Sequence, residues 1–177
     1  GLGDVYKRQA LYNAGKKVVF VNCSGSPIGM EPETKYCQAI LQAWYPGQAG
    51  GTAIVDALWG EYNPGGRLPV TFYKDVNQLP DFEDYSMKGR TYRYMQQQPL
   101  FPFGHGLSYT DFTYGEAKLS KNTIAKGENV VLTIPVSNVG QRDGEEVVQV
   151  YLRRPGDKEG PRYTCLLYTS PSPRDPK

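Results

Sequence analysis

Residues 39–72, AILQAWYPGQAGGTAIVDALWGEYNPGGRLPVTF, place the strongest constraint on how this chain can fold. An apolar run over residues 39–45 is long enough for a buried strand. Residues 46–51 then break it, because proline fixes φ and glycine permits dihedral angles that other residues avoid. Apolar residues next recur at helical spacing: Ala53, Ile54, Ala57 and Leu58. Residues 63–66, NPGG, end this helix, and residues 68–72 are expected to be extended. Strand, glycine-rich loop, helix, turn and strand are typical of half an α/β layer.

A second strand is predicted before this stretch. Residues 18–22, VVFVN, form a continuous β-branched run of the kind found in central parallel strands, and the loop that holds Ser24 follows them. Residues 31–37 form a polar connector with room for one short helical turn. The order predicts a parallel sheet with right-handed crossovers. Because open α/β sheets bind ligands at the carboxyl ends of their strands, the loops after both strands are candidate ligand-binding segments.

Composition excludes several classes of function. The net charge of +2 with 21% charged residues implies no strongly basic face, so we expect neither nucleic acid nor an anionic membrane as a partner. No apolar run approaches the ~20 residues that a membrane span needs. The 14 tyrosines, 20 glycines and 14 prolines indicate a turn-rich protein with aromatic surfaces, as carbohydrate and peptide binders often have. We expect Cys23, Cys37 and Cys165 to be unpaired structural thiols, because their spacing fits neither a metal site nor an even disulfide set.

From residue 75 the pattern changes. Residues 75–109 are rich in turns and aromatics, and we interpret them as a docked linker that pins a second domain against the first. Within it, residues 89–94 alternate aromatic and basic side chains, which predicts an exposed strand. The prolines and glycines of residues 99–109 exclude a regular helix there.

Residues 110–164 predict a β-sandwich, because short alternating segments are separated by turns: residues 112–120, 130–138 and 146–152. A seven-stranded sandwich takes ~100 residues, so we expect a truncated one. The predicted fold class is α/β followed by all-β: a partial α/β sandwich with a parallel sheet and helices, then a truncated β-sandwich.

Several segments together resemble the family 3 glycoside hydrolases of the β-glucosidase and β-xylosidase type. Their order and spacing match over residues 10–164, and several long motifs in sequence are far more specific than one glycine loop. The matching segments are residues 16–21 with 24–27, 39–48 with 50–51, 60–72, 90–94 and 100–109.

The resemblance implies the domain layout. Residues 10–74 correspond to the C-terminal part of the family's α/β sandwich domain, residues 75–109 to an aromatic linker, and residues 110–164 to the start of a fibronectin type III-like domain. Residues 1–9 and 165–177 do not fit the family; we interpret them as a non-native flank and a non-native tail and exclude them from the fold argument.

The resemblance also implies the chemistry. Family members are exo-acting, retaining β-glycosidases with an amino-terminal (β/α)₈ barrel, which carries the nucleophilic aspartate. The acid/base residue lies upstream of the strand matched by residues 18–22. We therefore expect no catalytic residue in this chain, no metal and no cofactor. The expected partners are a β-linked oligosaccharide and the missing barrel of the same chain. The family reading implies hydrolysis of β-glucosides or β-xylosides in plant polysaccharide breakdown. The sequence leaves the compartment open, with export expected for the parent protein.

Four residues are candidates for positions beside the substrate: Ser24, Trp44, Tyr45 and Gln48. Trp44 and Tyr45 can stack on sugar faces, although packing in a core or interface explains them at least as well. Ser24 or Ser26 with His105 suggests nucleophilic catalysis, but no G-x-S-x-G elbow surrounds either serine.

The acidic residues of the loops are read as solvated charges rather than a catalytic pair: Glu31, Glu33, Asp81, Glu83 and Asp84. Residues 46–51 match no phosphate-binding motif, which disfavours a nucleotide-binding domain. The main alternative to the prediction of an enzyme is a non-catalytic scaffold or carbohydrate-binding module.

Overall fold

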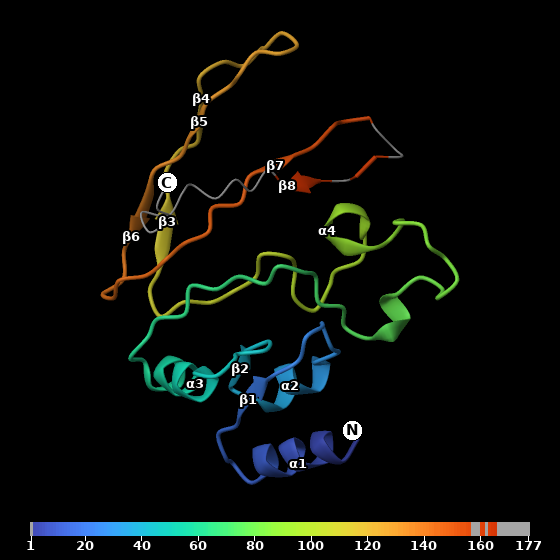
Figure 1. Ribbon diagram of the computed structural model, residues 1–177, viewed down its shortest axis with the longest axis vertical. Helices are drawn as coiled ribbons and strands as arrows, with labels where there is room; N and C mark the ends of the chain where they lie inside the picture. The colour runs from blue at the N-terminus through green and yellow to red at the C-terminus, as the bar shows by residue number, and fades with distance from the viewer. Residues whose placement is uncertain (1, 157–159, 162, 166–177) are drawn as a thin grey trace.

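The computed structural model describes residues 2–156, 160–161 and 163–165 (Figure 1). The amino-terminal half consists of α1 (Leu2–Asn13), β1 (Val19–Asn22), α2 (Glu31–Tyr36), β2 (Ala39–Gln42) and α3 (Gly50–Trp59). β1 and β2 pair in parallel, so the predicted parallel α/β arrangement is confirmed for this half. The strand predicted over residues 39–45 is shorter, because the backbone leaves the strand after Gln42 and Trp44 adopts a φ of 54°.

Helix α1 docks against α2 and β1. Arg8 forms an ion pair with Glu33, which is 5% exposed, and its guanidinium lies 5.0 Å from the centre of the Phe20 ring. Tyr12 meets Tyr36 edge-to-face at 5.7 Å. The boundary expected after Gln9 thus falls inside α1, while the non-native origin of residues 1–9 stays a prediction. Of the tail, only Cys165 lies within the described residues.

Helix α3 begins at Gly50, inside the predicted glycine-rich loop, and ends at Trp59, before the turn at residues 63–66 that the sequence predicts as its end. Ala57 is its buried apolar residue, and Gly60 closes the helix with a φ of 83°, a conformation that glycine adopts without strain. Cys23 and Cys37 are free thiols, as expected, but Cys23 is exposed rather than buried. Burial raises the pKa of the Cys37 thiol.

Two extended segments run side by side across the middle of the molecule (Figure 1). Leu68 N–H donates to the His105 carbonyl at 2.8 Å, and Phe72 N–H donates to the Phe101 carbonyl at 2.9 Å. Phe72 is fully buried, and its ring meets Phe101 at 6.3 Å. His105 stacks on Phe101 at 5.0 Å, so the single histidine packs in the aromatic linker, as the sequence predicts.

The exposed strand predicted over residues 89–94 is wrong, because Thr91–Tyr94 form the short helix α4. Local contacts hold this turn. The Arg90 guanidinium donates to the carbonyls of Ser86 and Asp84, and Thr91 N–H donates to the Tyr73 hydroxyl at 3.0 Å. Tyr92 stacks on Phe103 at 4.5 Å. The alternation of aromatic and basic residues therefore reflects a clamp on the linker rather than the two faces of a strand.

The carboxy-terminal half contains antiparallel two-stranded pairs. β3 (Phe112–Tyr114) pairs with β6 (Val136–Asn138), β4 (Lys118–Leu119) with β5 (Leu132–Thr133), and β7 (Tyr151–Leu152) with β8 (Thr164–Cys165). The strands predicted over residues 112–120 and 130–138 thus each divide in two, and only the end of residues 146–152 is a strand. Within the described residues these pairs do not assemble into two packed sheets.

A proline explains the division of the long ribbon. Pro135 has no N–H to donate, and only its carbonyl accepts a bond, from Gly115 N–H at 2.8 Å. The pairing passes from Tyr114↔Val136 to Lys118↔Thr133, so one strand advances four residues while its partner advances three. The ribbon therefore contains a bulge at this point.

Polar contacts hold the carboxy-terminal half, called the ribbon half below, against the amino-terminal α/β half. Arg67 forms a 2.8 Å ion pair with Glu146, with side chains only 11% and 18% exposed. Asn63 accepts from Ser108 Oγ and donates to the Asp143 carbonyl. These contacts, which we call the polar latch, are completed by three more bonds: Tyr109 Oη to the Ala57 carbonyl, Arg142 to the Gly60 carbonyl, and Gln149 to the Gly104 carbonyl.

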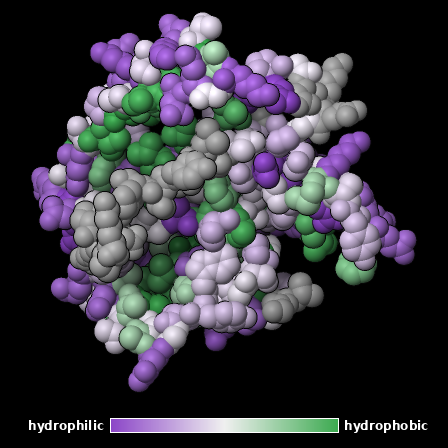
Figure 2. Space-filling model, turned by 45° about the horizontal axis from the view of Figure 1, so that its top comes forward, coloured by the Kyte–Doolittle hydropathy of each residue, from purple (hydrophilic) through white to green (hydrophobic). Residues whose placement is uncertain are grey.

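Little of the apolar surface is enclosed. Among the described residues, the buried hydrophobic side chains are Met30, Ala57, Phe72 and Met95. Figure 2 accordingly shows hydrophobic residues gathered in surface patches between hydrophilic ones. The polar latch and the aromatic linker therefore provide much of the stabilisation between the two halves.

The first prediction concerns the latch. Replacing Arg67 by methionine leaves Glu146 largely buried without a counter-charge, so we expect the free energy of unfolding to fall by about 3 kcal/mol. Lys121→Met is the matched control, because it breaks the exposed pair with Glu128 and should cost less than about 1 kcal/mol. Urea unfolding of both variants measures the difference. Equal losses would contradict the account of the latch.

The second prediction concerns pH. Burial of the ring is the larger cause that lowers the pKa of His105 in the folded chain, and the nearby Arg67 charge lowers it further. As pH falls below about 6.5, the unfolded chain takes up this proton first, so stability from neutral His105 is present above that pH and is lost below it. We expect His105→Phe, which keeps a ring against Phe101, to lose less stability than the wild type between about pH 7.5 and 5. Urea unfolding of both proteins across this pH range measures the difference. If the wild type loses no more stability than His105→Phe, the prediction is wrong.

Candidate functional site

Strands β1 and β2 end side by side in two amide residues. Asn22 and Gln42 are direct partners in the parallel register, so both side chains lie at the carboxyl end of the pair. Asn22 is 6% exposed, and its Nδ2 donates to Gln42 Oε1 at 2.6 Å and to Ser24 Oγ at 2.9 Å. Ligands of open α/β sheets bind at this edge.

Ser24 is held firmly within this group. Its hydroxyl donates to the Ser26 carbonyl at 2.9 Å, and its own carbonyl accepts from Gln42 Nε2 at 3.3 Å. We call Asn22, Ser24 and Gln42 the strand-end cluster. The cluster fixes the first loop against the end of the second strand, and its bonds use amides and a hydroxyl. Such groups orient neutral polar ligands.

Trp44 leaves β2 with a left-handed backbone. A φ of 54° is uncommon for a bulky residue and persists only where surrounding packing imposes it. Here the half-buried indole meets the buried Phe72 ring edge-to-face at 6.0 Å. Trp44 is thus partly a packing residue, which was the competing interpretation from the sequence, and part of its surface remains exposed.

Tyr45 is 81% exposed and covers the first loop. A Cβ at Gly25 would come within 2.6 Å of the Tyr45 hydroxyl, so glycine is needed for this close approach. The structure therefore brings together Ser24, Trp44 and Tyr45 around the ends of β1 and β2. An exposed tyrosine beside a polar cluster offers an apolar face and a hydrogen-bonding tip to a ligand.

Gln48 lies in the loop that precedes α3 and is exposed. Gly47 in the same loop has a φ of 70°, and a Cβ at Gly50 would fall 2.6 Å from Pro46 Cβ. Gln48 therefore sits on the tight loop that follows Tyr45, at the rim of the group rather than within the strand-end cluster.

The acidic residues have local roles. Asp81 accepts a hydrogen bond from the backbone N–H of Glu83, and Asp84 accepts one from the backbone N–H of Ser86. Hydrogen bonds from the backbone and side chain of Ser86 hold the pKa of Asp84 below its usual range. Asp81 and Asp84 are thus exposed loop residues, in agreement with their interpretation as solvated charges. Glu33 is an exception, because it is buried and paired with Arg8.

No catalytic triad is assembled from the serines and His105. Ser24 Oγ donates to Ser26, whereas His105 stacks on Phe101. Within the described ranges, no three His, Cys, Asp or Glu side chains are grouped to hold a metal ion. Over the same part of the chain, no helix is long and apolar enough to cross a membrane.

The sequence reading missed Asn22 and Gln42 as site residues. The signal was present, since each closes an apolar strand with an amide, but their pairing depends on a register between residues 20 positions apart.

Comparison with known proteins assigns the family. The model of the glycosyl hydrolase family 3 C-terminal domain matches residues 8–109. A xylan 1,4-beta-xylosidase of Xylanibacter ruminicola is 60% identical over 153 residues, which cover 86% of this chain and 17% of that protein. A periplasmic beta-glucosidase of Salmonella typhimurium is 39% identical over 156 residues, covering 81% of this chain and 20% of its own length.

Solved structures agree with this match. The beta-glucosidase 3B of Thermotoga neapolitana in complex with glucose superposes with a TM-score of 0.78 at 31% identity, covering 89% of this chain and 24% of that one. This chain thus spans about a sixth to a quarter of the length of the relatives named here. It belongs to glycosyl hydrolase family 3, whose C-terminal domain it carries over residues 8–109.

Proposed function

We propose that this chain is part of a retaining, exo-acting β-glycosidase that hydrolyses β-glucosides or β-xylosides during plant polysaccharide breakdown. The observation that carries the proposal is the family match over residues 8–109 together with the polar and aromatic surface at the ends of β1 and β2. The relatives named above, a xylosidase and a glucosidase, support both substrate classes.

In this proposal the two reacting carboxyl groups lie outside this chain. A retaining glycosidase needs a nucleophile and an acid/base about 5–5.5 Å apart. Two carboxylates of low exposure form ion pairs with arginines, Glu33 with Arg8 and Glu146 with Arg67. The strand-end cluster is held by hydrogen bonds among amide, hydroxyl and carbonyl groups. The partner that completes the enzyme is the barrel of the same protein.

The part proposed for this chain is one wall of the sugar site. Tyr45 offers an exposed ring, Trp44 a partly exposed indole, and Ser24 and Gln48 offer polar atoms beside them. Such a wall binds and orients a sugar ring while proton transfer and nucleophilic attack are carried out by carboxyl groups outside this chain.

The carboxy-terminal half is proposed to be the beginning of a fibronectin type III-like domain. The antiparallel ribbon of β3–β6 and β4–β5 and the separate pair β7–β8 support this assignment. Exposed apolar side chains on the ribbon, such as Val131 at 61% and Val139 at 58%, are suited to covering by further strands.

A non-catalytic scaffold or carbohydrate-binding module is the alternative, and the high exposure of Tyr45 is the observation that favours it. The two proposals differ in one respect. As an enzyme part, the chain must complete an active site when it is joined to a family barrel.

The third prediction tests this difference with a chimera. The 153 matching residues of the Xylanibacter ruminicola protein are replaced by those of this chain. We expect the chimera to hydrolyse nitrophenyl β-xyloside, and we expect Trp44→Ala and Tyr45→Ala to raise its KM about tenfold, since a ring contact contributes roughly 0.5–1.5 kcal/mol beyond its buried area.

Tyr85→Ala is the matched control, because Tyr85 is 88% exposed and lies in the linker. Its kinetics should equal those of the chimera. A folded chimera without activity would overturn the enzyme proposal and favour the scaffold. A Tyr45→Ala chimera with unchanged KM would overturn the wall.

A further inference from the structure

A pocket lies beside α4, away from the strand-end cluster. Its volume is about 340 Å³, within the lower range of small-molecule sites. Its lining comprises Thr71, Tyr92, Met95, three consecutive glutamines at 96–98, Pro99, Pro102, Phe103 and Tyr163. None of these residues carries a charge at neutral pH.

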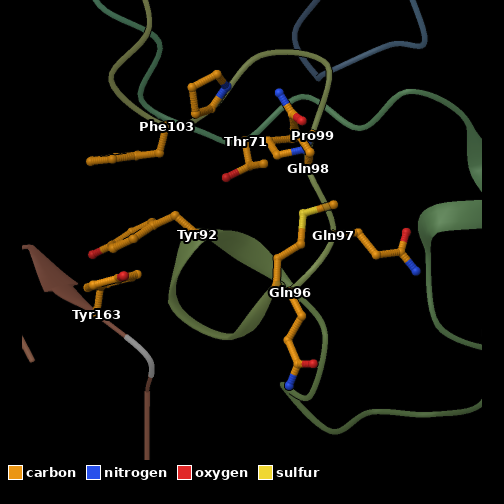
Figure 3. A pocket seen from close by; sticks show the side chains of 10 residues that line it. Thr71, Tyr92, Gln96, Gln97, Gln98, Pro99, Phe103 and Tyr163 are labelled. Atoms are coloured by element: carbon orange, nitrogen blue, oxygen red, sulfur yellow. The ribbon is translucent and has the colours of Figure 1, made fainter. Parts of the chain in front are cut away.

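Thr71 is the unusual member of this lining. It is 6% exposed, yet its Oγ1 is a buried atom with no hydrogen-bond partner. Figure 3 shows this hydroxyl directed toward the side of the pocket that holds Tyr92 and Phe103. An unpaired buried hydroxyl destabilises the folded chain, so a ligand that bonds to it recovers free energy.

The backbone explains why Thr71 faces the pocket. It precedes Phe72 in an extended segment, where successive side chains point to opposite sides. Phe72 faces Trp44 and Phe101, so Thr71 faces away from them. The two adjacent residues thus face opposite sides. Phe72 faces the strand-end surface, which is the surface at the ends of β1 and β2, and Thr71 faces the pocket.

Aromatic rings form one side of the pocket. Phe103, Tyr92 and Tyr163 lie one above another in Figure 3, and Phe103 and Tyr92 are stacked at 4.5 Å. Met95, 7% exposed, adds a buried apolar side chain. The exposed glutamines contribute amide donors and acceptors at the rim.

We propose that this pocket binds a neutral sugar ring as an auxiliary saccharide site. The edges of the stacked aromatic rings and Met95 contact the apolar C–H groups of the sugar, Thr71 Oγ1 bonds to one sugar hydroxyl, and the glutamine rim bonds to others. The absence of charge in the lining disfavours phosphates, carboxylates and amines. The amide rim and the buried hydroxyl favour a polyhydroxylated ligand over a hydrocarbon.

This inference goes beyond the proposed function, because the pocket has no group to cleave a glycosidic bond and its occupancy does not depend on the barrel. It extends the chain's contact with a saccharide from the strand-end surface to the linker. A second contact on the same chain raises the effective concentration of substrate near the first.

The test is a titration of the isotopically labelled 177-residue chain with methyl β-xyloside and methyl β-glucoside, followed by amide chemical shifts. We expect saturable shifts at Thr71, Gln96–Gln98 and Phe103 with millimolar affinity. Phenol and sodium benzoate are the comparison probes, and neither should compete.

Thr71→Val keeps the side-chain shape and removes the hydroxyl. We expect it to weaken sugar binding about tenfold, as loss of one good hydrogen bond does, without lowering the unfolding midpoint, since the removed group is unpaired. Thr110→Val is the matched control: Thr110 is also 6% exposed, but its Oγ1 donates to Asn138 at 2.7 Å. It should lower the midpoint and leave sugar affinity unchanged.

Three results would overturn the inference. Shifts confined to Asn22–Ser24 and Gln42–Gln48 would place the sugar only at the strand-end surface and leave the proposed function intact. Equal affinity in Thr71→Val would show that the buried hydroxyl takes no part. Displacement of the sugar by phenol would assign the pocket to aromatic ligands instead.

Discussion

The burial of Phe72 is the contact on which the rest of this structure depends. Its ring is fully enclosed between Trp44, at the end of the parallel pair, and Phe101, in the linker. Its backbone pairs with Phe101 as well, so one residue joins the α/β layer to the linker by both packing and hydrogen bonding. The position of Trp44 beside the strand-end cluster and the position of Thr71 in the pocket both follow from it.

Around this contact the two halves are joined by polar groups more than by a shared apolar core. Arg67, Asn63 and Arg142 each link residues about 80 positions apart. Because such bonds are directional, they fix how the ribbon half sits on the α/β half, whereas apolar contacts alone would permit sliding. The proposed role as one wall of a composite sugar site would need this fixed geometry, since small displacements of binding groups cost much of their effect.

The sequence was informative where structure is local. Helical periodicity predicts α3, and the β-branched run predicts β1. It was misleading at residues 89–94, where a hydrogen bond from Thr91 N–H to the distant Tyr73 and the stacking of Tyr92 on Phe103 stabilise a helical turn. It could not show that Pro135 would divide the ribbon opposite Gly115, because that depends on which strand pairs with which.

The candidate site was predictable in part for the same reason. Ser24, Trp44 and Tyr45 lie in loops after recognisable strands, so their neighbourhood follows from the α/β pattern. Asn22 and Gln42 require the register, and the aromatic pocket requires residues from positions 71, 92–103 and 163 to converge. Long-range packing, which no single-segment pattern encodes, brings these groups together.

The central claim is that this chain is proposed to position a sugar while the reacting carboxylates lie outside it. The most direct measurement is the hydrolysis of nitrophenyl β-xyloside and nitrophenyl β-glucoside by the purified 177-residue chain alone. The account predicts release of nitrophenol no faster than in buffer. Saturable turnover of either substrate that disappears when Glu33 or Glu146 is replaced by glutamine would contradict it.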